Sequence, residues 1–388
     1  MKEIVIVSAA RTPIGKFRGM YTNVSAVELG TQVIKAAIKR ANISTDQVDQ
    51  VILGNVLQAG LGQNPARQAA IHAGIPQTAT AMTVNQVCGS GLKAVMLGQQ
   101  ALQLGLAQTV VVGGTENMTQ APLLLKREDK ANVATTQLSD SMFSDGLTDA
   151  FGHYAMGVTA ENLVDHHHIS REAQDLFAFN SQQTAANAQA AGKFTAEIAP
   201  VTLADGTVLS VDESIRPQTT LAKLAELKPV FKAGGSVTAG NSSTINDGAA
   251  ALVLMTKDDA IAQNIPFLAT IKAAVEIGTD PAMMGYAPFY AVTQLLAKAD
   301  LPIEAIDLFE LNEAFAAQSL AVMTDLKIPA SKININGGAI ALGHPIGASG
   351  ARILTTLIAN LNETQTALGV ASLCIGGGMG VAVLIERA

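Results

Sequence analysis

A cysteine stands between an apolar run and three small residues in the stretch NQVCGSGLKAV, residues 85–95. If a helix follows, the Cys88 side chain lies at its N-terminus, where free N–H groups and the helix dipole favour an anion. Such a position lowers the pKa of a thiol and supplies more of the nucleophilic thiolate. Gly89 and Gly91 would also let a ligand approach the backbone closely. The alternative is a cysteine that only packs in the core, as most free cysteines do, and this stretch alone leaves both interpretations open.

The second of the two cysteines, Cys374, ends a strand-like run in GVASLCIGGGMGVAVLIE. Three glycines follow shortly after it, and the backbone N–H groups of such a turn can bind a developing oxyanion. A packing cysteine does not need this neighbourhood, although glycines are also common in turns between strands. The sequence therefore favours a chemical role for Cys374, with a backbone donor such as Gly376 beside it.

Two polar residues lie at further junctions between predicted elements. His344, in NGGAIALGHPIGASGARIL, lies between a predicted short strand and a helix and could act as a general base or a hydrogen-bond donor. Asn312 follows the strand-like IDLFEL, where an asparagine usually caps the next helix but could instead hold a catalytic water. A histidine with only structural hydrogen bonds is the alternative for His344. The glycine spacings match neither a P-loop nor a dinucleotide-binding fingerprint.

Three consecutive histidines, residues 166–168, have a different explanation. Neighbouring side chains on a helix point about 100° apart, so the three cannot face one metal ion. We expect a solvated helix end there and no metal site.

These residues are embedded in strand-like runs that alternate with segments of helical period. EIVIVSAA is followed by AVELGTQVIKAAIKRAN, VDQVILGNVL and NPARQAAIHAGI. Residues 84–118 continue with a strand, a helix and a buried strand predicted to end at the glycine pair 113–114. The alternation predicts an α/β fold in which helices cover a sheet.

The same pattern returns near the end of the chain. Asp49 and Asp307 occupy similar places in two such patterns and are about 258 positions apart. The stretch Cys88-Gly-Ser-Gly91 precedes Gly347-Ala-Ser-Gly350 by about 259 positions, and each opens a predicted helix. This constant spacing predicts two halves of similar architecture packed face to face.

Residues 119–240 interrupt this rhythm with polar residues, glycine and proline, and with one clear helix near 171–191. Ser170 is a suitable N-cap for that helix. We predict an inserted loop domain over 119–240. The N-terminal core half then comprises 1–118 plus 241–268, and the C-terminal core half comprises 269–388.

Composition narrows the classes of function. Of the 388 residues, 48% are hydrophobic and 15% are charged, which suits a large buried core. No apolar run is long enough for a signal peptide or a membrane span, and two cysteines without C-x-x-C predict neither a disulfide framework nor zinc. The simplest location is a reducing cytoplasm. A net charge of −7 argues against nucleic-acid binding, and a locally basic segment, which includes Arg216 and Lys228, reads from charge alone as a solvated face.

Together the motifs resemble those of the thiolase family. The stretches that carry the resemblance run in family order along nearly the whole chain: SAARTPIGKFRG, NQVCGSGLKA, GGTENMT, AGNSSTINDGAA, NEAFA, GGAIALGHPIGASGAR and CIGGGMG. The resemblance is greatest to the biosynthetic branch. It implies a duplicated thiolase-like fold, layered α-β-α-β-α, with the loop domain inserted.

The resemblance also implies catalytic roles. Cys88 matches the nucleophile that takes the acyl group, and His344 the histidine that accepts the thiol proton and later helps to bind a thioester oxygen. Cys374 matches the acid/base that removes a proton from the α-carbon of the incoming acetyl-CoA. Asn312 matches the asparagine that holds a water beside His344 in one oxyanion hole. The backbone N–H groups of Cys88 and Gly376 match the other.

For coenzyme A, the resemblance points to the loop domain and the strand after it. Arg216 matches the arginine near the adenine end and Ser243 a serine that contacts the pantetheine, and the apolar walls match Leu147, Phe231, Met156 and Met284. One position departs from the family pattern: Ala155 stands where biosynthetic members usually have histidine. This departure puts the range of acyl chain lengths in doubt.

The expected function is therefore reversible Claisen condensation of two acetyl-CoA to acetoacetyl-CoA and CoA, by a ping-pong mechanism. The alternatives are a degradative 3-ketoacyl-CoA thiolase of broader chain length and a non-enzymatic CoA-binding scaffold on the same fold. The resemblance implies acyl-CoA substrates, no required metal or cofactor, and a homo-oligomer, dimer or tetramer. We expect tetramer contacts in the loop at 119–145, and no nucleic-acid or membrane partner.

Overall fold

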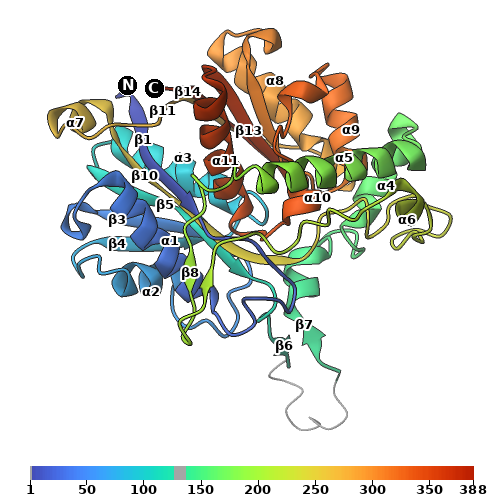
Figure 1. Cartoon of the computed structure of the whole chain (residues 1–388), viewed down its shortest axis with the longest axis horizontal. Coiled ribbons are helices and arrows are strands. Elements are labelled where there is room, and N and C mark those ends of the chain that lie inside the picture. The colour runs from blue at the N-terminus through green and yellow to red at the C-terminus, as the bar shows by residue number, and fades with distance from the viewer. Residues whose placement is uncertain (1, 126–136) are drawn as a thin grey trace.

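The main feature of the fold is a ten-stranded mixed sheet built by two similar halves of the chain (Figure 1). The structure is a computed structural model and describes residues 2–125 and 137–388. Nine strands follow the order β12-β13-β14-β11-β1-β10-β5-β3-β4, and β2 pairs with β10 at the side. No helix in the described residues is both long and apolar enough to cross a bilayer.

The N-terminal half alternates strands and helices as the apolar pattern predicts. Its elements are β1 (Ile4–Arg11), β2 (Gly15–Lys16), α1 (Ala26–Ala41), β3 (Gln50–Gly54), α2 (Pro65–His72), β4 (Thr80–Val84), α3 (Ser90–Gln103), β5 (Thr109–Asn117), β10 (Asn246–Thr256) and α7 (Lys257–Ala262). A capping box between Ser25 and Glu28 fixes the start of α1. The prediction that β5 ends at Gly113–Gly114 is wrong, because the strand pairs with β10 as far as Asn117.

The C-terminal half repeats the arrangement, with four strands in place of six among the described residues. Its elements are β11 (Ala269–Gly278), α8 (Ala287–Ala299), β12 (Leu308–Leu311), α9 (Ala316–Asp325), α10 (Ala339–Leu342), α11 (Ser349–Thr364), β13 (Leu368–Ile375) and β14 (Met379–Arg387). The counterpart of β4 is reduced to a single bridge between Phe309 and Ile333. The predicted short strand before the His344 loop is also wrong, since the short helix α10 precedes it.

The duplication extends to individual hydrogen bonds. Asp49 Oδ2 accepts from the backbone N–H groups of Gln108 and Thr109, at 2.7 and 3.0 Å. Asp307 Oδ2 likewise accepts from the two residues at the start of β13, both at 2.9 Å. Each aspartate therefore locks its own parallel strand to the next one. The helices α3 and α11 also begin in the predicted register, at Ser90 and Ser349.

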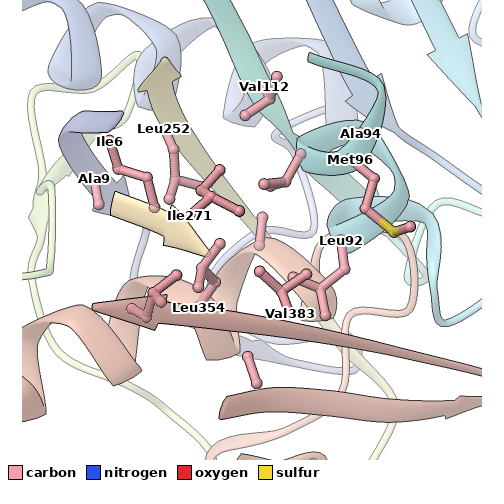
Figure 2. Packing of buried hydrophobic residues seen from close by; sticks show 14 of the residues in the cluster. Ile6, Ala9, Leu92, Ala94, Met96, Val112, Leu252, Ile271, Leu354 and Val383 are labelled. Carbon is pink, nitrogen blue, oxygen red and sulfur yellow. The ribbon is translucent and has the colours of Figure 1, made fainter. Parts of the chain in front are cut away.

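The two halves share one hydrophobic core around α3 and α11. Leu92 and Met96 on α3 pack with Leu354 on α11 and with strands of both halves, including Leu252 of β10 and Val383 of β14 (Figure 2). The two halves are also joined within the ten-stranded sheet, where β1 pairs with β11 over three residue pairs. This shared helical layer confirms the layered, duplicated α/β fold expected from the sequence.

The described part of residues 119–240 lies outside the main sheet. It contains the two-stranded pairs β6 (Leu123–Leu124) with β7 (Ser139–Asp140) and β8 (Val201–Thr202) with β9 (Val208–Leu209), and the helices α4 (Gly157–His167), α5 (Arg171–Ala190) and α6 (Leu221–Ala225). Ser170 caps α5 as predicted. The domain boundaries themselves stay a prediction. The expected tetramer contacts at 119–145 fall partly on residues 126–136, which lie outside the described residues.

A fully buried arginine ties the loop region to the core. Arg11 of β1 donates through Nε to Glu197 at 2.7 Å and through both Nη atoms to Asp212 at 2.7 and 2.9 Å. A two-pronged guanidinium–carboxylate pair fixes orientation as well as distance. It therefore fixes the chain just before Arg216.

The three histidines form a helix end, as expected. The helix α4 stops at His167, and His168 takes the left-handed conformation of a C-cap. The ring of His167 packs against Tyr286 at 5.0 Å between centroids, so one of the three is half-buried rather than solvated.

Candidate active site

Cys88 lies on a tight turn between β4 and α3. The residue before it, Val87, has φ of 45°, in a left-handed region that β-branched side chains rarely adopt. Ser90 holds this turn: its Oγ donates to Val87 O at 2.6 Å and accepts from the backbone N–H of Gln86 at 2.8 Å. The conformation turns the chain sharply, and Cys88 lines a large cavity.

The predicted lowering of the Cys88 thiol pKa is wrong. Burial raises the pKa of Cys88 to about 11, although the backbone N–H groups of Gly376 and of Cys88 itself bond the sulfur and favour the thiolate. The turn at the helix N-terminus is present as expected. The loss of water around the sulfur outweighs the effect of the helix N-terminus, because a thiolate is poorly stabilised in an apolar site.

Cys374 reaches the same cavity from the other half of the chain. It lies at the end of β13 and is buried among apolar side chains that include Met284, Met156 and Phe231. Burial raises its thiol pKa, and the nearby Cys88 raises it further. The glycine turn that follows places the N–H of Gly376 at the Cys88 sulfur. Two thiols and a backbone donor therefore share one site, although Cys88 and Gly376 are more than 280 residues apart in sequence.

His344 faces this site from the loop between α10 and α11. Its Nδ1 lies 2.6 Å from the Oγ of Ser349, and that hydroxyl donates to Pro345 O at 2.9 Å. Because the hydroxyl proton is used in this way, Ser349 accepts from Nδ1–H, and Nε2 keeps its lone pair. Burial, aided by the charge of Arg352, lowers the pKa of His344 to about 3, so the ring is neutral. A neutral imidazole with a free Nε2 can accept a proton.

Asn312 lies behind His344 instead of capping a helix. The next helix, α9, begins at Ala316 with Phe315 at the N-cap, so the capping interpretation is wrong. Asn312 is buried, its Nδ2 is 3.5 Å from His344 Nε2, and its Oδ1 has no protein partner among the described residues. At 3.5 Å a direct hydrogen bond is weak, which leaves this amide suited to hold a bridging water.

The cavity has a volume of about 710 Å³ and is mostly apolar. It brings together all but one of the residues singled out in the sequence: Cys88, His344, Cys374, Gly376, Arg216, Ser243, Leu147, Phe231, Met156 and Met284. Asn312 is the exception, one layer behind the wall. The mouth of the cavity carries two exposed cationic side chains, Arg216 and Lys16. Glu213 forms an ion pair with Lys16 at 3.3 Å. Such a channel fits a long ligand with an anionic end.

Ala155 lies on the wall of this cavity beside Met156. His153, two residues earlier, is exposed in a left-handed turn and does not replace the missing imidazole. The wall near the reacting groups is therefore apolar at this position.

Three residues of the site were not found in the sequence. Ser349 orients His344, and Asn246 accepts from the His344 backbone N–H at 3.0 Å. Val87 presents Cys88 through its unusual φ. Ser349 stands in repeat register with Ser90, which was a usable signal, but no local pattern marks Val87 or Asn246.

The arrangement suits covalent acyl transfer: a thiol nucleophile, an imidazole that can take its proton, and backbone donors at the sulfur. Family models agree with this class. The model described as thiolase, N-terminal domain, matches residues 4–258, and the model described as thiolase, C-terminal domain, matches residues 265–387. The chain belongs to the thiolase family and is an acyltransferase.

Individual relatives match over the full length. The chain is 52% identical to a probable acetyl-CoA acetyltransferase of Escherichia coli and 51% identical to an acetyl-CoA acetyltransferase of Cupriavidus necator, each alignment covering 100% of both chains. It is 51% identical to a probable acetyl-CoA acyltransferase of Staphylococcus epidermidis, over 100% of this chain and 99% of the relative. The crystal structure of the Bacillus anthracis acetyl-CoA acetyltransferase superimposes with a TM-score of 0.98 at 43% identity, covering 100% of this chain and 99% of that one.

Proposed function

We propose that this protein condenses two acetyl-CoA molecules to acetoacetyl-CoA and CoA, reversibly, through an acetyl group carried on Cys88. The observation that carries the proposal is the meeting of two thiols, one neutral imidazole and backbone N–H donors in one cavity with a cationic mouth. The names of the full-length relatives support acetyl-CoA as the substrate.

In the first half-reaction, the Cys88 sulfur attacks the carbonyl carbon of acetyl-CoA while His344 Nε2 takes the thiol proton. The oxyanion that forms is held by the N–H groups of Cys88 and Gly376. The carbon–sulfur bond to CoA then breaks. Because burial raises the pKa of the Cys374 thiol, it is protonated and can give its proton to the departing CoA thiolate. Acetyl-Cys88, free CoA, a Cys374 thiolate and a protonated His344 result.

In the second half-reaction, the Cys374 thiolate removes a proton from the α-carbon of a second acetyl-CoA. His344 and a water on Asn312 stabilise the enolate oxygen as charge develops there. The α-carbon attacks the acetyl carbonyl, a carbon–carbon bond forms, and the bond to Cys88 breaks. The proton on His344 returns to the Cys88 sulfur, and Cys374 keeps the proton taken from the α-carbon, so all three groups regain their starting protonation states. Atoms and charges balance over the cycle.

The test is intact-mass and peptide-map analysis after incubation with acetyl-CoA. We expect an acetyl group on Cys88 that free CoA discharges, and none in Cys88→Ala. Cys374→Ala is the matched control for the second step: it loses the group proposed for enolate formation, so it should retain some acetylation of Cys88 but no condensation. A folded wild-type protein that binds CoA yet never carries the acetyl group would favour the scaffold alternative.

A degradative 3-ketoacyl-CoA thiolase of broader chain length is the second candidate, and Ala155 is the observation that favours it. An alanine on the cavity wall leaves more room beside Met156 than a histidine would. Thiolysis rates on 3-ketoacyl-CoA substrates of increasing length separate the two candidates. A steep fall beyond the four-carbon substrate supports the acetyl-specific enzyme, and a flat profile supports the broader one.

The remaining expectations are part of the same proposal. The condensation needs only acyl-CoA substrates, since the thiols, the imidazole and backbone donors supply every proton transfer and oxyanion contact, and we propose that no metal or cofactor is required. We propose a cytoplasmic homo-oligomer, dimer or tetramer, as the sequence led us to expect.

A further inference from the structure

The motif GGTENMT contains a buried carboxylate that the proposed reaction does not use. Glu116 lies near the end of β5 and has 0% of its surface exposed. Its two oxygens accept four N–H donors: Oε2 from Val56 N at 3.0 Å and Gly347 N at 2.9 Å, and Oε1 from Leu57 N at 3.1 Å and Asn55 Nδ2 at 2.9 Å. It is therefore fully bonded without touching the cavity.

These donors come from both halves of the duplicated fold. Three belong to the loop after β3, whereas Gly347 belongs to the C-terminal loop that carries His344. The carbonyl of Gly347 is packed against Gly54 and Gly114, where a Cβ on either glycine would collide with it. A Cβ on Gly347 would itself come within 2.6 Å of Glu116 Oε2. The His344 loop thus docks on the N-terminal half mainly through backbone atoms, and Glu116 is its charged anchor.

All four partners donate, so the site is built for the ionised carboxylate. Burial raises the pKa of Glu116 to about 7, and the backbone donors act in the opposite direction. The charge is close enough to the nucleophile to contribute to the raised pKa of Cys88. Glu116 therefore lies beside Cys88 in the N-terminal half and bonds the loop of His344 in the other.

We propose that Glu116 is a positioning residue that docks the His344 loop onto the half that carries Cys88 and so sets the distance between imidazole and thiol. The importance of that distance rests on the proposed function. The docking itself does not, and it can be measured without any substrate.

The test compares Glu116→Gln with Asp247→Asn. A glutamine has one acceptor oxygen, and its NH₂ group would face two of the N–H donors. Asp247 is the matched control because it is also a buried carboxylate on the adjacent strand β10, but it bonds Thr119 instead of the His344 loop. Hydrogen–deuterium exchange of the peptide covering 344–348 reports docking, and kcat and KM for thiolysis report its consequence.

We expect Glu116→Gln to speed exchange at 344–348 and to lower kcat about a hundredfold, since misplacement by about 1 Å costs that much, while KM changes little. Asp247→Asn should leave the exchange rate at 344–348 and the value of kcat close to those of the wild-type protein. Wild-type exchange and kcat in folded Glu116→Gln would overturn the proposal, and so would equal effects in both variants.

If Glu116→Gln does not fold, Gly347→Ala tests the same contact from the other side with the carboxylate intact. It should also speed exchange at 344–348, and normal protection there would overturn the proposal. If wild-type protein shows no thiolase activity, the proposed function fails, whereas the exchange measurements still decide whether Glu116 docks the loop.

Discussion

Gly91 and Gly350 lie back to back where α3 and α11 begin, although they belong to different halves of the chain. A Cβ on Gly91 would lie 3.2 Å from the backbone N of Gly350 and 2.6 Å from that of Ala351. A Cβ on Gly350 would collide with the backbone of Leu92. The two glycines occupy equivalent positions of the repeat, so the helices that follow Cys88 and His344 approach each other there through backbone atoms, with no room for a side chain between them.

Gly350→Ala should therefore lower the free energy of unfolding by about 1–3 kcal/mol, the usual cost of overpacking a core. In an ordinary exposed helix the same substitution raises the free energy of unfolding by about 1 kcal/mol. The sign of the change therefore distinguishes the two situations. Urea denaturation measures the change. Gly278→Ala is the control, because nothing lies within 4 Å of the added Cβ. Unaltered stability of Gly350→Ala would mean that the two helices can move apart freely.

Ser349→Ala should reduce kcat about ten- to a hundredfold with little change in KM. The variant loses the acceptor that holds the Nδ1–H of His344, so the ring is free to rotate or to take the other tautomer. Steady-state thiolysis kinetics test this. Ser8→Ala is a suitable control, since Ser8 is another buried serine whose Oγ makes a hydrogen bond, to Ala37 O at 2.7 Å, far along the chain from the site. Equal losses of kcat in the two variants would contradict the assignment.

Without added substrate, Cys88 should react slowly with iodoacetamide at neutral pH. Cys88 has a pKa raised to about 11 and His344 one lowered to about 3, so thiol and imidazole are both neutral over the whole range between. The thiolate fraction, and with it the alkylation rate of Cys88, should rise about tenfold per pH unit from about pH 6 to about pH 9. Peptide mapping, with Cys88→Ala as the blank, measures it. A plateau near neutral pH would reveal an ion pair of thiolate and imidazolium at rest.

Arg216→Glu should raise the KM for CoA thioesters about tenfold and leave kcat nearly unchanged, the cost of losing one charged contact at the mouth. The effect should shrink as salt is added, because the residue is exposed and its field is screened. Arg18→Glu makes the same charge change on an exposed residue that stacks on Phe17, and we expect it to leave KM almost unaffected. An unchanged KM would mean that Arg216 makes no contact with the bound CoA thioester.

The duplication could be predicted from the sequence because equivalent residues recur at a constant spacing. Asp49 and Asp307 make the same pair of backbone bonds, and Ser90 and Ser349 open equivalent helices. The grouping of the cysteines with His344 could also be anticipated, since each stands where a strand or a glycine-rich loop meets the next element. Thiolase motifs then gave these positions their expected roles.

Other properties depend on contacts that a linear pattern does not record. The pKa of Cys88 was predicted in the wrong direction because a helix N-terminus is visible in the sequence and the loss of solvent is not. For Asn312, local statistics alone favour a helix cap, and only the family resemblance indicated its role beside His344, which is its neighbour in space 32 positions away. Glu116 and Gly347 meet across 231 positions. Such pairs become visible only when both halves are assembled.

The shared helical layer also bears on how the chain folds as it is synthesised. Leu254 of β10 and Leu354 and Ile358 of α11 belong to one core, so the N-terminal strands are covered on that face by a helix that is synthesised about 100 residues after β10. Until then their apolar face is open to solvent, and an incomplete chain exposes surface that favours aggregation. The two halves therefore do not fold independently, because the N-terminal half cannot complete its core before α11 is made.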